Sequence, residues 1–492
     1  MVEETSIKFK KIDMIWQFTV DILDLKYNMK KLARKVSDSK LVCAYVRPHT
    51  AEEQLDGQIE TGFRKDMNAS VKSKIDLLLK EIYESDFNTL DKEYLEAQNF
   101  TRFLLKSIKI RLPFNEKLFD CDIVLTITKL GIAVFNFWVH IDVELNSNQI
   151  AELQLLPTKE VEIVVEIPKE LLFELKNMSE KYLKYYEKTS ESKPSILLSM
   201  DFEVLIFLYW CSLINILNNR SFKSKYLEDL EIIKNKKYRY EARYIFPLVI
   251  AKTTEPAYTS TEDMIQQHPK QLYQILSHLD KIDYNIIRLS STVDFLEPNL
   301  SERQDIAFLN STGSVLLLFG SETQEIRRHL LEAFCIVEII QIQRYYFGFL
   351  ISKLNQPFKK INVRKISIMR SYFSTGLNMY YTKLTANSLA SKRLSNGKRI
   401  MELDDSYEML NNKIDLLGEA LQSFSQLKTS VFEITVAAIL GFLSVFFIFL
   451  PSDNDIINLI FGTILLCIIA GSLLGLFIVS KFVWKWLKSK KI

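Results

Sequence analysis

The sequence predicts an α+β protein: a mixed sheet with flanking helices, a long stalk helix and a C-terminal hairpin of two transmembrane helices. Three observations lead to this fold class. Segments rich in Val, Ile and Phe lie between residues 118 and 167, and a heptad pattern follows Gly397. Two apolar runs, Ile434–Leu450 and Ile456–Val479, come near the end of the chain. We therefore expect most of the mass in a globular body and the C-terminal part in a membrane.

Composition bounds the class of protein. The 492 residues are enough for about two or three domains. The 63 basic and 60 acidic side chains nearly balance, so direct nucleic-acid binding is not expected. A hydrophobic content of 48% predicts a packed body rather than a disordered chain. The five cysteines form no CxxC pair and Met1–Ser6 carries no apolar leader, which predicts reduced thiols and no secretory signal.

The first 110 residues are predicted to be mostly helical. In the segment Val71–Tyr83, apolar residues recur at the three- and four-residue spacing of one helix face. Strands are predicted next, over Asp122–Thr128 and Ile132–Leu145, with a turn at Lys129–Gly131.

A third strand is predicted over Val161–Ile167, where Glu160, Glu162 and Glu166 alternate with apolar residues. Alternation of this kind is typical of a sheet with one solvated face. The competing interpretation, a cluster of carboxylates around a metal ion, needs more than alternation to support it.

Helices and one further strand are predicted for the middle of the chain. Lys169–Tyr186 and His268–Leu279 have helical patterns, Tyr240–Ala251 is strand-like, and from about residue 324 the chain is predicted to be helical with long apolar stripes. The apolar stretch Phe202–Leu217 is only 16 residues long, which favours a buried helix over a third membrane span.

A heptad seam precedes the first apolar run. Gly397 predicts a turn between helices, and from there one helix is expected over Arg399–Leu450, about 78 Å long. The alternating spacing of three and four residues is carried by Tyr407, Leu410, Ile414, Leu417, Leu421, Phe424 and Val431. Such a seam favours self-association, and the alternative is packing on helices of the same chain.

The two apolar runs predict spans over residues 431–450 and 456–480. The connecting turn carries Asp453 and Asp455, whereas the tail after the second run is rich in Lys and Trp. Basic flanks stay on the cytoplasmic side and Trp lies at the headgroup level. We therefore expect a multi-pass protein of the cell membrane, an inner or plasma membrane, with both termini in the cytoplasm and the lipid bilayer as its first partner.

These patterns divide the chain into five parts. They are a cytosolic α/β sensory domain over 1–320 with its sheet around 118–167, a helical region over 321–396, the stalk over 397–430, the hairpin over 431–480 and a basic tail over 481–492.

One face of the first span is unusually small and polar. Its residues are Ser430, Glu433, Ala437, Gly441 and Ser444. In a ring of such helices this face would line a pore, with Glu433 at the inner mouth, because an ionisable residue at a membrane edge rarely faces lipid. The outer mouth would be formed by Asp453, Asn454 and Asp455. The alternatives are close packing of helices through small residues, and an acidic turn that only stays in solvent.

The order of a stalk helix, a first span, a short outer turn, a second span and a basic tail resembles the CorA family of divalent-cation channels. The ending Lys481–Lys488 is similar to the basic and aromatic ending of that family. The resemblance covers residues 399–492. It implies a homopentamer with an α/β/α cytosolic domain and a divalent cation as cargo or regulator. Five copies would then place ten carboxylates from Asp453 and Asp455 around the mouth.

The sequence departs from the family at its signature. The tripeptide Gly-Met-Asn, which the family carries at the outer end of the first span, is replaced by Phe449–Asn454. Magnesium selectivity is therefore not implied. Some CorA-like proteins without the tripeptide have enlarged cytosolic domains and serve type III CRISPR antiviral systems as effectors gated by a nucleotide messenger. The resemblance makes such a messenger an alternative partner.

No catalytic motif for nucleotide hydrolysis, zinc proteolysis or acyl transfer occurs, so no enzymatic activity and no cofactor are expected. The sequence favours a homo-oligomeric ion channel, with a cation as the expected cargo. The alternatives are the messenger-gated effector and a membrane-anchored sensor or scaffold that does not conduct.

Overall fold

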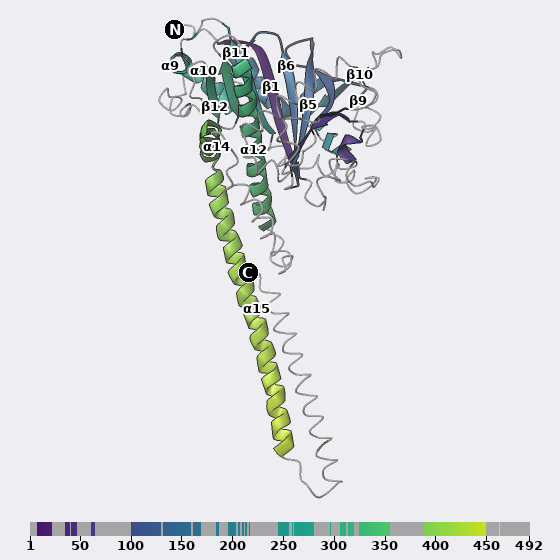
Figure 1. Ribbon diagram of the computed structural model, residues 1–492, viewed down its shortest axis with the longest axis vertical. Helices are drawn as coiled ribbons and strands as arrows, with labels where there is room; N and C mark the ends of the chain where they lie inside the picture. The colour runs from purple at the N-terminus through teal and green to yellow at the C-terminus, as the bar shows by residue number, and fades with distance from the viewer. Residues whose placement is uncertain are drawn as a thin grey trace. The chain divides into compact units, whose positions relative to one another are not determined.

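We describe the protein from a computed structural model (Figure 1). The chain divides into two compact units, Met1–Gly348 with Thr375–Asp405, and Phe349–Ser374 with Ser406–Ile492. The structure describes residues 7–21, 35–39, 41–46, 61–63, 100–128, 131–158, 161–168, 184–185, 195–202, 205–206, 209–210, 212–213, 216, 245–254, 258, 260–279, 296, 306–310, 313–318, 324–354, 388–448 and 462.

The first unit is built on one large mixed sheet. Among the described residues 13 strands join it, in the order β12-β13-β11-β1-β6-β5-β4-β8-β10-β9, with β2, β3 and β7 attached beside this path. All pairs are antiparallel except β11 with β13. The strands are β1 (Lys8–Asp21), β2 (Val42–Val46), β3 (Thr61–Phe63), β4 (Phe100–Arg111), β5 (Leu118–Thr128), β6 (Ile132–Ile141), β7 (Leu145–Asn146), β8 (Glu162–Pro168), β9 (Lys184–Tyr185), β10 (Ser195–Asp201), β11 (Ile245–Thr253), β12 (Ile306–Asn310) and β13 (Ser314–Leu318).

The helices whose bounds the structure gives belong to both units. They are α5 (Ser147–Leu155) with a 3-10 turn at Leu156–Thr158, α9 (Thr261–Gln267), α10 (Pro269–Ser277), α12 (Gln324–Leu354), α14 (Ser388–Ile400) and α15 (Leu403–Ile448). The start of α5 is fixed by a capping box, in which Asn146 accepts from the amide of Gln149 and the side chain of Gln149 accepts from the amide of Asn146.

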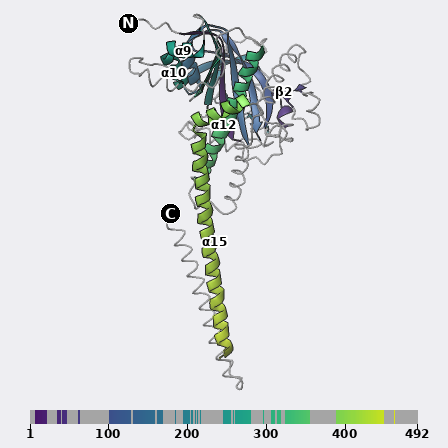
Figure 2. The same ribbon diagram turned by 60° about the vertical axis from the view of Figure 1, so that its left-hand side comes forward.

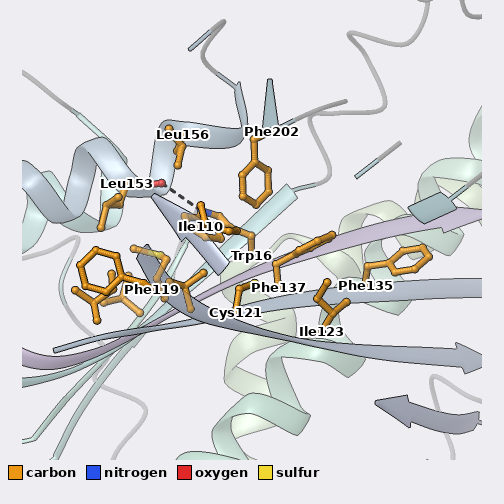
Figure 3. Close-up of a cluster of buried hydrophobic side chains, with 14 of the residues drawn as sticks. Trp16, Ile110, Phe119, Cys121, Ile123, Phe135, Phe137, Leu153, Leu156 and Phe202 are labelled. Atoms are coloured by element: carbon orange, nitrogen blue, oxygen red, sulfur yellow. Dashed lines mark hydrogen bonds between the residues drawn. The ribbon is translucent and has the colours of Figure 1, made fainter. Parts of the chain in front are cut away.

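The hydrophobic core lies on one face of the sheet. Alternate residues of a strand point to opposite faces, so Trp16 of β1 and Phe137 of β6 share the face that Phe202 covers. Figure 3 shows these rings together, with ring centroids 4.8 Å apart for Trp16 and Phe202 and 5.6 Å apart for Phe137 and Phe202. The indole Nε1 of Trp16 donates to the carbonyl of Leu153, 3.2 Å away, which pairs the buried N–H and joins α5 to β1.

The opposite face of the central strands is covered by α12. The ring of Phe334 on α12 lies 5.5 Å from that of Trp138 on β6, and Glu338 reaches Arg102 of β4. The two views of the chain place α12 along the sheet (Figure 1 and Figure 2). The central strands β1, β5 and β6 are therefore buried on both faces.

The predicted fold class is confirmed at the level of a mixed α+β domain with a large sheet and flanking helices. The strands predicted between residues 118 and 167 are β5, β6 and β8, and Gly131 in the turn has a φ of 76° that glycine adopts without strain. On β8 the side chains of Glu162 and Glu166 lie on the more exposed side and accept from serines of β10, as expected of a solvated face.

The predicted helical character of residues 1–110 is wrong for the part that the structure describes. Its long elements there are strands β1 and β4, and the segment Val71–Tyr83 lies outside the described residues. In β1 the polar residues Asp13, Gln17 and Thr19 share one face, which breaks the continuous apolar run expected of a buried strand.

The structure describes eight positions of the apolar stretch 202–217, namely 202, 205–206, 209–210, 212–213 and 216, and all eight are helical. All of them except Ile216 are buried, and Phe202, Leu205 and Tyr209 are each 0% exposed in the hydrophobic core. This agrees with the prediction of a buried helix.

The stalk helix begins later than predicted. Helix α14 runs through Gly397, and the break comes at Met401 and Glu402, where Glu402 has a φ of 52°. A left-handed non-glycine residue interrupts helical hydrogen bonding, so α15 starts at Leu403 rather than Arg399. The 46 residues of α15 correspond to a length of about 69 Å.

Within the described residues, no helix has both the length and the apolar character that crossing a bilayer requires. The predicted span 456–480 lies outside those residues apart from Gly462, and the predicted span 431–450 reaches beyond the end of α15.

Candidate functional site

Helix α15 carries all the residues predicted to line a pore. They are Ser430, Glu433, Ala437, Gly441 and Ser444. The first four are exposed, and a Cβ added at Gly441 would meet nothing within 4 Å. The predicted outer mouth, Asp453, Asn454 and Asp455, lies outside the described residues.

Large apolar side chains are exposed on the same stretch of α15. Phe432 is 68% exposed, Ile434 66% and Leu440 57%. Exposing an apolar surface of this kind to water costs free energy, so these side chains require lipid or another protein surface to cover them.

The hydroxyl of Thr435 donates to the carbonyl of Val431, 2.7 Å away, and so is paired within the helix itself.

The exposed face of α15 that carries the predicted pore residues continues towards the start of the helix, where it also includes apolar residues. At alternating spacings of three and four residues it comprises Met409, Asn412, Leu416, Glu419, Ser423, Gln426, Ser430, Glu433 and Ala437. All of these residues are exposed, including Met409 at 43% and Leu416 at 65%. We call this set the exposed stripe of α15.

Only part of the heptad seam predicted on α15 is exposed to solvent. Leu410 is 0% and Ile414 5% exposed, so the chain itself covers the beginning of the seam. Val431, at the other end, is 42% exposed. Packing on the same chain, the alternative interpretation of the seam, therefore holds for its first turns.

A buried ion pair joins the sheet to α12. Arg102 Nη2 and Glu338 Oε2 are 2.6 Å apart, and the two side chains are 4% and 1% exposed. The carboxylate also accepts from the hydroxyl of Thr126 at 2.7 Å and from Asn136 Nδ2 at 2.8 Å. Arg102 donates to Thr126 at 2.9 Å, and its guanidinium lies 5.6 Å from the ring centre of Phe334. The network satisfies a charge pair that burial would otherwise make costly.

A second buried ion pair joins α12 to α14. Arg393 Nη1 lies 3.1 Å from Glu332 Oε1, with side chains 3% and 7% exposed. Neither buried pair was predicted from the sequence. The signal in the sequence is a lone charge inside an apolar segment, as in Phe100–Leu105 for Arg102 and Ala333–Ile340 for Glu338.

A half-exposed histidine lies between two carboxylates on strands β1, β5 and β6. His140 Nδ1 is 2.6 Å from Asp13 and its Nε2 is 3.3 Å from Asp122, which also accepts from the hydroxyl of Ser107. Partial burial alone would lower the pKa of His140, but hydrogen bonds to both carboxylates and their charge raise it to about 10. The same contacts lower the pKa of Asp122 despite its burial.

This cluster favours a structural ion network over a catalytic base. A protonated imidazolium has no lone pair with which to take a proton near neutral pH. In the sequence His140 was one of five isolated histidines, and only the pairing of β6 with β1 and β5 brings the two aspartates to it.

Among the described residues no group of His, Cys, Asp and Glu side chains is arranged to hold a metal ion. Comparison of the chain with known protein families, with curated proteins and with solved structures gave no match.

Proposed function

We propose that the chain is the subunit of a homo-oligomeric, pentameric ion channel of CorA-like architecture, with cations as cargo and the sheet domain as its regulatory part. One observation carries the proposal. Between Ser430 and Gly441, α15 exposes apolar residues and a small, polar face on the same helix. A ring of copies in a bilayer satisfies both surfaces, because lipid covers the apolar side and the polar side faces a pore.

The membrane arrangement is part of the proposal. Residues 431–450 and 456–480 form the two spans, the acidic turn lies outside the cell and both termini are cytoplasmic. The charge asymmetry of the turn and the tail supports this orientation. The pairing of Thr435 within its own helix suits a membrane position, since lipid offers a hydroxyl no partner.

The exposed stripe of α15 supports the pore. In a ring of parallel helices the stripe would form successive rings of side chains, with Glu433 and Glu419 as carboxylate rings that attract cations. Met409 and Leu416 would form apolar rings at the other end of the same path. Carboxylate rings favour cations over anions, and apolar rings give a place where the path can dewet and close.

Ion flux through reconstituted vesicles tests the proposal. Glu433→Ala should lower the preference for cations over anions, because it removes one carboxylate ring. Glu408→Ala is the matched control, because Glu408 is an exposed glutamate of α15 that lies outside the stripe. A change in the control equal to that in Glu433→Ala would count against the pore assignment.

Two alternatives give different results in the same assay. A membrane-anchored scaffold conducts no ions under any condition. An effector gated by a nucleotide messenger conducts only after such a nucleotide is added. Flux that depends on the nucleotide would therefore identify the channel as this messenger-gated effector.

A further inference from the structure

Buried polar side chains lie between α12 and the sheet, beside the contact of Phe334 with Trp138. The sheet contributes Arg102, Thr126, Asn136, Gln17 and Thr19, and α12 contributes Glu338 and Gln341. None of these residues is more than 4% exposed. The other face of the same strands packs on an apolar core. Helix α12 therefore meets the sheet through polar groups as well as through the Phe334–Trp138 contact, and buried polar groups stabilise a packing arrangement only where they are paired.

Several atoms of these buried polar side chains have no partner in the described part of the chain. They are Gln17 Nε2 and Oε1, Thr19 Oγ1, Asn136 Oδ1 and Gln341 Nε2. Each such atom carries a desolvation penalty that a hydrogen bond would remove. A different position of α12 that paired some of them would recover part of this free energy.

The unpaired groups lie to either side of Glu338. Helix α12 is aligned with β6, because Phe334 contacts Trp138 and Glu338 accepts from Asn136. Gln341 follows Glu338 by one turn on the same helix face. On the other side, towards Phe334, the indole Nε1 of Trp138 is a buried donor that also lacks a partner among the described residues.

We propose that α12 has a second position on the sheet, displaced along β6 by about one helical turn, or about 5.4 Å. There Glu338 accepts from Trp138 Nε1, and Gln341 takes the place of Glu338 beside Asn136. The Arg102–Glu338 ion pair holds α12 in the position seen in this structure. One-turn displacements of packed elements are a known form of conformational switching.

The displacement would be passed to α14. Glu332 of α12 and Arg393 of α14 form a buried pair, so α14 moves with α12 or breaks the pair. Along the chain, Met401 and Glu402 connect α14 to α15. A link from the displacement of α12 to ion conduction rests on the proposed function of α15. The existence of two positions of α12 does not depend on that function.

Hydrogen exchange of the full chain in detergent tests the two positions. Glu338→Gln removes the charge that holds α12 and keeps the side-chain volume. Amides of α12 and α14 should exchange about a hundredfold faster, while those of β5 change little. Glu144→Gln is the matched control, because Glu144 pairs with Lys8 on the surface and is 46% exposed. Equal acceleration in β5 and α12 would mean general destabilisation and would overturn the proposal.

Trp138→Phe separates a second position from simple loosening. It keeps an aromatic ring against Phe334 but removes the donor that the second position uses, so it should slow the exchange of α12 in the Glu338→Gln background. Loosening predicts the opposite, because a contact has been trimmed. Unchanged or faster exchange of α12 in that double variant would therefore refute the second position.

Glu332→Gln tests the link to α14. On its own it should speed the exchange of α14, because it leaves the buried Arg393 without its counter-charge. Adding Glu338→Gln should then speed α12 but not α14 any further, because the two helices are no longer coupled. If Glu338→Gln still speeds α14 in that background, the coupling through Arg393 is wrong.

Flux measurements keep this proposal apart from the proposed function. Exchange that follows the predictions without any flux would support two positions of α12 and contradict the channel. Flux in the wild type, with uniform exchange in the variants, would support the channel and contradict the switch.

Discussion

The buried pair Arg102–Glu338 allows a quantitative prediction of stability. Both side chains are at most 4% exposed, so solvent screens their interaction little. Replacing Arg102 with Met leaves a buried carboxylate without its counter-charge, which costs about 3–5 kcal/mol. Thr126 and Asn136 still donate to Glu338, so we expect the lower end of that range, about 3 kcal/mol. A loss of this size is a large fraction of the stability of a typical domain.

The assay is urea unfolding of the first unit, followed by the fluorescence of the buried tryptophans. The double variant Arg102→Met with Glu338→Met should lose less stability than the sum of the two single variants, with a coupling energy of about 2 kcal/mol. Lys8→Met is the control, because the Lys8–Glu144 pair is exposed and should contribute less than about 1 kcal/mol. If Arg102→Met costs no more than Lys8→Met, or the double variant equals the sum, the reasoning fails.

Two further predictions concern the histidines. The folded-state pKa of His140, about 10, exceeds its ordinary 6.5, so its cluster stabilises the fold fully below pH 6.5 and the contribution is lost as pH rises through about 10. The difference in melting temperature between wild type and His140→Gln should therefore shrink between pH 7 and pH 10, and an unchanged difference would contradict the assignment. Gly313→Ala should lower stability by about 1–3 kcal/mol, because its Cβ would lie 2.3 Å from the buried Nε2 of His278. Adding His278→Ala should restore part of this loss in thermal melts, and no recovery would point to another cause.

The sheet was predictable where the sequence is apolar on both strand faces. β5 and β6 are covered by the core on one face and by α12 on the other, and their Val, Ile and Phe runs indicate this burial. β1 is equally central, but Asp13, Gln17 and Thr19 place polar side chains on one of its faces. Its partners β6 and β11 are also far away in the chain. Such pairing is set by tertiary structure, which local propensity does not record.

The two candidate sites differ in the same way. The exposed stripe of α15 belongs to a single helix, so residue spacing alone placed Ser430, Glu433 and Ala437 on one face. The Arg102 and His140 networks join strands and helices that lie far apart in the sequence. Spacing could show only that a charge interrupts an apolar segment, and not which partner meets it.

The oligomeric mass of the full chain in detergent tests the central claim most directly. Each chain has a mass of 57.5 kDa, so we expect a particle of five copies, about 288 kDa, once bound detergent is subtracted. Light scattering combined with size-exclusion chromatography gives this value without assuming a shape. A particle of one chain would contradict the channel, because α15 then has no copies with which to enclose a pore.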